Sequence, residues 1–181
     1  MSAAGQHAIT LNVAVLYTGS YYAKDDRGTI AKAREVLDRY NIGLRLWPDD
    51  GQRSGGNMLS DLTTAIPHTE AAYKALRKRV DAMVRGGSGF AVYAPAVFSQ
   101  FDHDGYGITP EWFKTVTRGC LVGPSGNSDC MDLLHELGHC AGCDHEHGED
   151  TRDNFMNEAN GRSEIGPEQI EKLMTATFAV G

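Results

Sequence analysis

The sequence has no long apolar run and carries little positive charge. None of its 181 residues belongs to a stretch approaching the roughly 20 apolar residues that cross a bilayer as a helix, so a transmembrane helix is not expected. Lysine and arginine number 17 against 24 aspartates and glutamates, which gives a net charge of −7. Nucleic acid is therefore not an expected partner, because phosphate binding requires a basic surface.

The N-terminal segment Met1–His7 also lacks the basic and apolar regions of a signal peptide. The chain is therefore either not exported by that route or a mature form of an exported protein. The remaining composition is that of an ordinary globular protein, with 41% hydrophobic and 23% charged residues. A chain of this length is expected to form one domain, or one domain split into two lobes by a cleft.

Hydrophobic periodicity predicts an α/β (α+β) protein. Alternating and β-branched residues predict strands, whereas apolar residues at helical spacing predict helices. The expected strands are Ala8–Tyr17, Ile42–Trp47, Gly89–Ser99, a short edge strand Tyr106–Thr109 and a last strand Lys114–Val122. The expected helices are Thr29–Tyr40, Thr69–Arg85, a helix that begins near Ser128, and Pro167–Phe178.

The most informative stretch is His135–His145, which reads HExxHxxGxxH. On a helix, His135 and His139 stand one turn apart on the same face. Two imidazoles so placed can bind one Zn²⁺ at about 2.0–2.1 Å. Glu136 comes next round the helix, near enough to reach a water at the metal without being a ligand itself.

Gly142 lets the chain leave this helix in a left-handed conformation, and the turn brings His145 towards the metal as a third ligand. Three protein ligands leave the fourth position for water, which is typical of catalytic rather than structural zinc sites. His147 is an alternative third ligand, but the position of the glycine favours His145.

The stretch resembles the zinc-binding motif of the metzincin metallopeptidases, all of whose fixed positions it matches. Members of that family also carry a Met-turn, a tight turn whose methionine lies beneath the zinc ligands. Asn154–Asn157, with Met156 inside it, fits that role. The resemblance implies a single catalytic domain with a twisted mixed sheet and helices in an upper lobe, about residues 1–142. A small irregular lower lobe, about residues 143–181, would carry the C-terminal helix.

The resemblance further implies a zinc-dependent endopeptidase, with one catalytic Zn²⁺ bound by His135, His139 and His145. Glu136 would act as general base on the water that attacks the scissile carbonyl, and would then pass the proton to the leaving amine. A protein or peptide substrate, a monomeric chain and a secreted or periplasmic location are expected. The alternatives are a non-catalytic zinc-containing binding module and a zinc hydrolase of a non-peptide amide. The presence of Glu136 argues against the binding module, because a structural zinc needs no general base.

Residues around the Met-turn leave the subfamily open. The short run from His145 to Met156 resembles that of the matrix metalloproteinases. The glutamate directly after the third histidine, Glu146, is instead a feature that resembles the astacin pattern. Two residues past Met156, where astacins carry a tyrosine near the zinc, this chain has Glu158. In metzincins the segment after the Met-turn forms a wall of the pocket that binds the substrate residue following the scissile bond. Arg162 is therefore a candidate for selecting acidic residues there; the alternative places Arg162 in solvent.

Four cysteines allow three complete disulfide pairings. If Cys130 and Cys140 lie on one helix, about 15 Å separates them, which is beyond the reach of a disulfide. Cys143 is excluded as a partner of Cys130 on the same grounds. The expected pairing is therefore Cys120–Cys130 with Cys140–Cys143. The alternative is four reduced thiols, as in a cytosolic protein.

Overall fold

The computed structural model describes residues 7–18, 27–49, 59, 69–98, 120–122, 129–158 and 161–181. The predicted edge strand Tyr106–Thr109 lies outside these ranges, as do Ser128 and the first part of the predicted strand Lys114–Val122. Within the described ranges, no helix combines the length and the apolar character that crossing a membrane requires.

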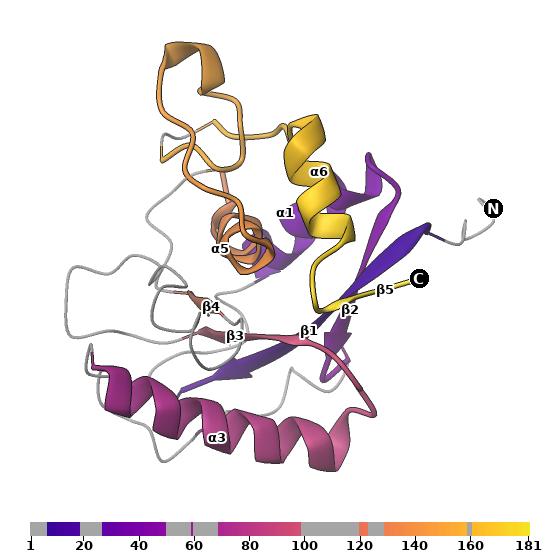
Figure 1. Cartoon of the computed structure of the whole chain (residues 1–181), viewed down its shortest axis with the longest axis vertical. Coiled ribbons are helices and arrows are strands. Elements are labelled where there is room, and N and C mark those ends of the chain that lie inside the picture. The colour runs from indigo at the N-terminus through magenta and orange to yellow at the C-terminus, as the bar shows by residue number, and fades with distance from the viewer. Residues whose placement is uncertain are drawn as a thin grey trace.

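A mixed sheet of five strands forms the centre of the described structure (Figure 1). Its central strand β1 (Ile9–Tyr17) pairs in parallel with β2 (Ile42–Trp47) on one edge and with β3 (Ala94–Phe98) on the other. β4 (Cys120–Val122) pairs in parallel with β3, which gives the order β2-β1-β3-β4. The short strand β5 (Ala179–Val180) pairs antiparallel with the start of β1 and makes the sheet mixed.

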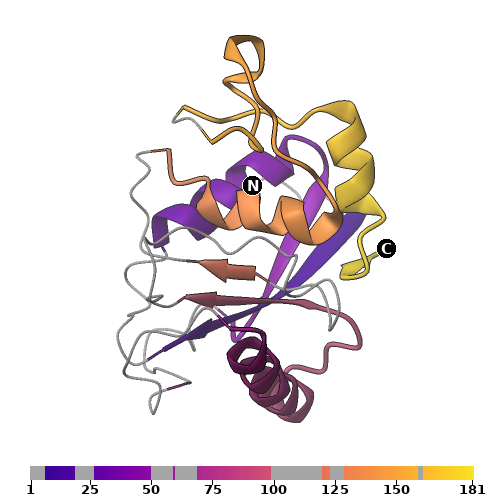
Figure 2. The same ribbon diagram turned by 60° about the vertical axis from the view of Figure 1, so that its left-hand side comes forward.

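Helices cover both faces of this sheet (Figures 1 and 2). α1 (Arg27–Asp38), α5 (Asp132–Ala141) and α6 (Pro167–Met174) lie on one face, and α3 (Glu70–Gly87) lies on the other. One turn of 3-10 helix, η1 (Glu149–Thr151), lies between α5 and α6 in the sequence. This arrangement confirms the predicted fold class.

β1 is buried on both sides because it lies between the two helical layers. All residues from 11 to 17 are buried, and successive side chains of a strand point to opposite faces. Val13 and Val15 therefore join the core beneath α1, α5 and α6, whereas Ala14 and Leu16 join a second core against α3. A strand covered on both faces needs a nearly continuous apolar run, and residues 11–17 supply one.

Most differences from the predicted elements concern their ends. β3 begins at Ala94 rather than Gly89, and α6 ends at Met174 rather than Phe178. After α6 the chain turns towards the sheet, where the Phe178 carbonyl accepts a hydrogen bond from the Asn12 N–H (3.0 Å). This contact starts the pairing of β5 with β1. The sequence does not predict β5, since two residues are too few to show an alternating pattern.

The helix that carries His135 and His139 begins later than predicted. The sequence indicates a start near Ser128, but α5 begins at Asp132, with Met131 before it. Cys130 has a left-handed φ of 57°, a conformation that a right-handed helix cannot contain. The side chain of Asp129 accepts a hydrogen bond from the Met131 N–H (3.1 Å) across this turn. Cys130 is therefore not part of the helix.

The predicted disulfide pairing is wrong, because Cys130, Cys140 and Cys143 are free thiols. Cys130 packs against α1, where a Cβ added at Gly28 would lie 3.1 Å from its Sγ. Cys140 and Cys143 are buried in the core, and burial raises the pKa of the Cys143 thiol to about 11. The cysteines thus give no support to the predicted secreted or periplasmic location.

Candidate metal centre

His135 and His139 lie one turn apart on α5, and each is only 8% exposed. Each ring has a backbone carbonyl at its Nδ1. His135 Nδ1 lies 2.9 Å from the Phe155 oxygen, and His139 Nδ1 lies 3.0 Å from the Cys143 oxygen. Because a carbonyl oxygen can only accept, Nδ1 is the protonated nitrogen of both rings. Each Nε2 therefore carries a lone pair that is directed away from the backbone.

A glycine turn leads the chain from α5 to the third histidine. α5 ends at Gly142, whose φ is 91°. The Gly142 N–H bonds to the His139 carbonyl and the Cys143 N–H bonds to the Gly138 carbonyl, both at 2.9 Å. These two bonds form the Schellman motif, which satisfies the last carbonyls of a helix and requires a left-handed residue. The predicted role of Gly142 is confirmed, and His145 follows three residues later.

The three histidines converge on one point. His145 Nε2 lies 2.9 Å from His139 Nε2 and 3.2 Å from His135 Nε2. Together they offer three ligand atoms within 4.8 Å of one another, a group that can hold a metal ion. His147 is exposed and is not part of this group; its ring centroid lies 5.9 Å from that of His145. The structure thus brings together the three histidines that the glycine spacing favours.

Burial favours the neutral form of His135. Desolvation lowers the pKa of His135 to about 4, although the hydrogen bond to Phe155 opposes this change. The guanidinium charge of Arg162 and the neighbouring imidazoles of His139 and His145 lower the pKa of His135 further. His135 is therefore neutral near pH 7, and neutral imidazole is the form that binds metal ions.

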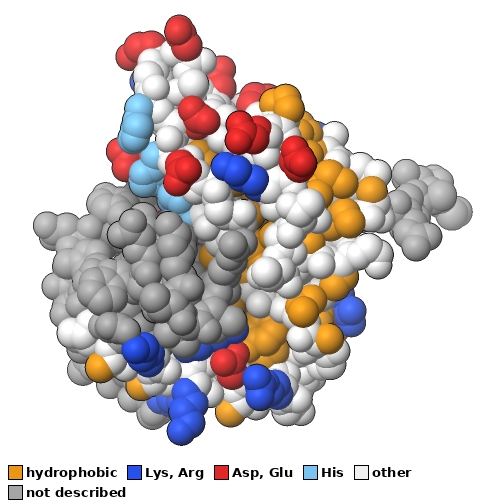
Figure 3. All heavy atoms as spheres, in the orientation of Figure 1, with side chains coloured by type: hydrophobic (Ala, Val, Ile, Leu, Met, Phe, Trp, Pro, Cys, Tyr) orange, Lys and Arg blue, Asp and Glu red, His pale blue; other side chains and the backbone are white. Residues whose placement is uncertain are grey.

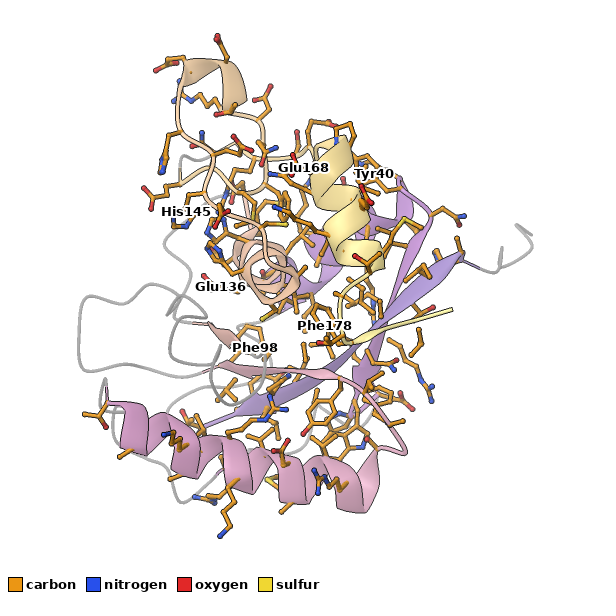
Figure 4. The ribbon with its side chains drawn as sticks, viewed as in Figure 1. Tyr40, Phe98, Glu136, His145, Glu168 and Phe178 are labelled. Atoms are coloured by element: carbon orange, nitrogen blue, oxygen red, sulfur yellow. The ribbon has the colours of Figure 1, made fainter. Side chains whose placement is uncertain are left out.

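Glu136 is the residue after His135 on α5 and is only 6% exposed. Its Oε2 is buried and has no hydrogen-bond partner among the described residues. Burial raises the pKa of this carboxyl group well above its usual range; Asp132 adds to the effect and Arg162 opposes it. Leaving a buried polar group without a partner costs about 1–3 kcal/mol, so stability does not explain Glu136. Figure 4 shows Glu136 and His145 on the same side of α5.

The segment Asn154–Asn157 forms the tight turn that the sequence predicts. The Asn157 N–H bonds to the Asn154 carbonyl (3.0 Å), and the Met156 N–H bonds to the Asn154 side-chain oxygen (2.8 Å). Met156 is fully buried, and a Cβ added at Gly138 of α5 would collide with its Sδ. The turn therefore packs directly on the helix that carries two of the histidines, and only glycine at position 138 permits this approach.

Three amide side chains hold this turn in place through contacts that the sequence does not predict. Asn154 and Gln169 of α6 exchange two hydrogen bonds through their amide groups (2.9 and 3.1 Å). The Asn157 amide donates to the carbonyls of Gly148 and Thr151 (3.4 and 3.2 Å). Such pairs follow no periodic pattern, so only the structure reveals them.

Arg162 is buried, with 3% of the residue exposed. Its Nε and Nη2 donate to the two carboxylate oxygens of Asp129 (2.9 and 3.0 Å), and Nη2 also donates to Asp132 (3.3 Å). Its Nη1 donates to the Asn157 carbonyl (3.4 Å). The predicted pocket role of Arg162 is therefore wrong, and so is the alternative that placed it in solvent. Arg162 instead joins the segment after the Met-turn to the start of α5.

The surface beside the histidines is acidic (Figure 3). Histidine side chains reach the surface there next to aspartates and glutamates. A negative surface raises the local concentration of cations, which suits a site that can hold a metal ion. The exposed acidic residues in this part of the chain are Asp144, Glu149, Asp150, Asp153 and Glu158.

Comparisons with known proteins match this chain by structure and not by sequence. No protein-family model and no curated protein matches the sequence. Mirolysin, solved in complex with compound 9, matches with a TM-score of 0.58 at 14% identity, over 92% of this chain and 91% of that chain. Metalloproteinase-II from Bacteroides fragilis matches with a TM-score of 0.56 at 14% identity, over 93% of this chain and 53% of that chain. This chain thus spans about half of the second protein.

These two structures are metallopeptidases of the metzincin type. At 14% identity the likeness concerns the fold. The chain therefore has the fold of the metzincin metallopeptidases, and its HExxHxxGxxH stretch brings together three histidines that can hold a metal ion. The resemblance predicted from HExxHxxGxxH is confirmed at this level, and the subfamily stays open.

Proposed function

We propose that this protein is a zinc-dependent endopeptidase. The observation that carries the proposal is the convergence of three Nε2 atoms, with the buried carboxyl group of Glu136 on the same side of α5 as His145. The Oε2 of that carboxyl group has no partner among the described residues. A buried acceptor of this kind does not stabilise a fold, but it suits a group that receives a proton from a water molecule during a reaction.

The donor set fits zinc. Imidazole nitrogen is a common zinc ligand, and three protein ligands with one open position are typical of catalytic zinc. Carbonyl oxygens at the Nδ1 atoms of His135 and His139 fix both rings, as the outer contacts of zinc ligands usually do. We assign His135, His139 and His145 as the ligands and Glu136 as the general base.

When bound there, zinc would supply positive charge that polarises a scissile carbonyl and lowers the pKa of water. Glu136 would take a proton from the attacking water and deliver it to the leaving amine, so that one carboxyl group serves first as base and then as acid. Its burial keeps the proton that it carries from exchanging with bulk water. The carbonyls of Phe155 and Cys143 would hold their histidine rings in place throughout.

The proposed substrate is a protein or peptide. Fold similarity to mirolysin and metalloproteinase-II supports a peptidase. The retained Glu136 supports catalysis over a binding module, since binding a structural metal requires no proton acceptor.

Metal analysis combined with a peptide-library digest tests this proposal. We expect one zinc per chain and cleavage that a chelator abolishes. His139→Ala should lose zinc and cleavage together, whereas His147→Ala, which removes an exposed histidine outside the cluster, should keep both. A parent protein that binds zinc and cleaves no peptide would contradict the proposal in favour of the binding module or the non-peptide hydrolase. A parent that binds no zinc would contradict it altogether.

A further inference from the structure

The three histidines differ in what lies at their Nδ1 atoms. His135 and His139 each face a backbone carbonyl at 3.0 Å or less. His145 instead faces a side chain: its Nδ1 lies 3.5 Å from Oε1 of Glu158. Among the described residues, Glu158 is the only acidic side chain within ion-pair distance of His145.

His145 also needs such support more than the other two histidines. His135 and His139 are fixed by α5 and by burial, with 8% of each exposed. His145 lies on the loop after the helix, and 25% of its side chain is exposed. An imidazole on a loop can rotate or change tautomer unless something binds its second nitrogen.

The Met-turn places Glu158 where it can act on His145. The Glu146 N–H bonds to the Met156 carbonyl (3.0 Å), and Glu146 forms a parallel bridge with Asn157. These contacts hold the segment that follows His145 beside the segment that precedes Glu158. The Met-turn is itself packed on α5, so Glu158 occupies a defined position although 67% of its side chain is exposed.

We propose that Glu158 is a positioning residue for the third zinc ligand: its carboxylate accepts the Nδ1 proton of His145 and so directs Nε2 towards His135 and His139. A carboxylate behind a ligating imidazole fixes the ring and makes its other nitrogen a stronger donor. This inference rests on the proposed function, since it assigns His145 as a ligand. It adds a residue that acts through its contact with the ligand His145.

The test compares two variants of Glu158 with one matched control. Glu158→Ala removes the acceptor, and Glu158→Gln keeps an oxygen acceptor but removes the charge. Glu149→Gln removes the same charge from an exposed glutamate of the same loop, whose ion pair is with Arg152 (3.7 Å) rather than with a histidine. Zinc affinity is measured by competition with a chromophoric chelator. In the metal-free proteins, long-range ¹H–¹⁵N spectra report the tautomer of His145.

We expect Glu158→Ala to weaken zinc binding by about 10–100-fold, the usual effect of removing an outer contact of a ligand. Glu158→Gln should weaken it less, and Glu149→Gln, which removes only one exposed charge of the acidic surface, should leave it nearly unchanged. The Nδ1–H tautomer of His145 should lose population in Glu158→Ala, while the thermal midpoint stays within a few degrees of the parent. Unchanged affinity and tautomer in Glu158→Ala would overturn the inference. An equal loss of affinity in Glu149→Gln would also overturn it, because the effect would then be one of overall charge.

These outcomes are separable from failure of the proposed function. If the parent binds no zinc, the proposed function fails, yet the tautomer of His145 in metal-free protein still tests its contact with Glu158. If the parent binds zinc and the Glu158 variants match it, the zinc assignment stands and only the positioning role is lost.

Discussion

α3 and α5 cover opposite faces of one sheet (Figure 2) and differ in the kinds of residue that they bury. α3 is long and amphipathic: Leu76, Val80 and Val84 are buried against the sheet, and most of its remaining residues are exposed. α5 is short, and nine of its residues, from Leu133 to Ala141, are buried. The buried set of α5 includes two histidines and a glutamate.

The two helices differ in whether packing explains the residues that they bury. Burying a polar side chain costs free energy unless a hydrogen bond compensates. On α5 three polar side chains, His135, Glu136 and His139, are buried within one and a half turns. The Nε2 atoms of the two histidines converge on His145, and Oε2 of Glu136 has no hydrogen-bond partner among the described residues. α3 also buries one charged side chain, Arg77, but pairs it with Asp81 of the same helix at 3.0 Å. We therefore ascribe the polar residues of α5 to chemistry, and the predictions below test the contrast between the two helices.

The largest stability effect is expected at Arg162. Arg162→Met leaves the carboxylates of Asp129 and Asp132 without their buried partner, and their side chains are only 7% and 17% exposed. Breaking a buried ion pair from one side typically costs about 3–5 kcal/mol. Urea unfolding followed by circular dichroism should show a loss of this size.

Arg77→Met on α3 is the matched control. Arg77 is also buried, with 6% of its side chain exposed, and pairs with Asp81 (3.0 Å), whose side chain is 28% exposed. Asp81 also accepts a hydrogen bond from the Tyr93 hydroxyl, so the variant leaves it partly solvated and still bonded. A loss of about 1–2 kcal/mol is expected. If the two variants lose equal stability, the two helices do not differ in the way described above.

The pair between Asp129 and Arg162 should also appear in the pH dependence of stability. Burial alone would raise the pKa of Asp129, but the hydrogen bonds and charge of Arg162 hold it below its usual range. A depressed folded pKa contributes stability that is present above the unfolded pKa of about 3.9 and is lost as the pH falls through the folded pKa. Asp129→Asn should therefore be less stable than the parent by about 1.5–3 kcal/mol at pH 7. The gap should shrink below about pH 4; a gap that stays constant down to pH 2 would contradict this account.

Replacing one glycine of each helix by alanine should change the stability by smaller amounts and in opposite directions. A Cβ at Gly138 of α5 would lie 2.6 Å from the Phe155 ring, whereas a Cβ at Gly86 of α3 would meet nothing within 4 Å. Gly138→Ala should cost about 1–3 kcal/mol by overpacking, despite the preference of helices for alanine. Gly86→Ala should gain up to about 1 kcal/mol from that preference. Thermal unfolding of both variants measures the signs, and a stabilising Gly138→Ala would show that the turn does not pack tightly on α5.

The sequence predicts the parts of this molecule that depend on local spacing. β1 and α3 follow from alternation and helical periodicity. The convergence of His135, His139 and His145 follows because all three lie within one helix and one turn, so that the position of Gly142 fixes the geometry.

Contacts between distant residues could not be predicted. α5 begins late because Asp129 turns away from the helix to bind Arg162, a residue 33 positions further along the chain. The same long-range contact explains why the pocket role predicted for Arg162 is wrong. The free thiol of Cys130 depends on packing against α1, and β5 depends on Asn12 of β1. Periodicity carries no information about such partners.

The most direct test of the central claim measures zinc content, stability and peptide hydrolysis of Glu136→Gln. If Glu136 serves chemistry rather than folding, the variant should bind one zinc per chain and unfold at the same urea concentration as the parent or a higher one. Its hydrolysis should fall by about 10²–10⁴-fold, the usual contribution of a general base. Hydrolysis at the parental rate, or a large loss of stability with little loss of activity, would contradict the claim.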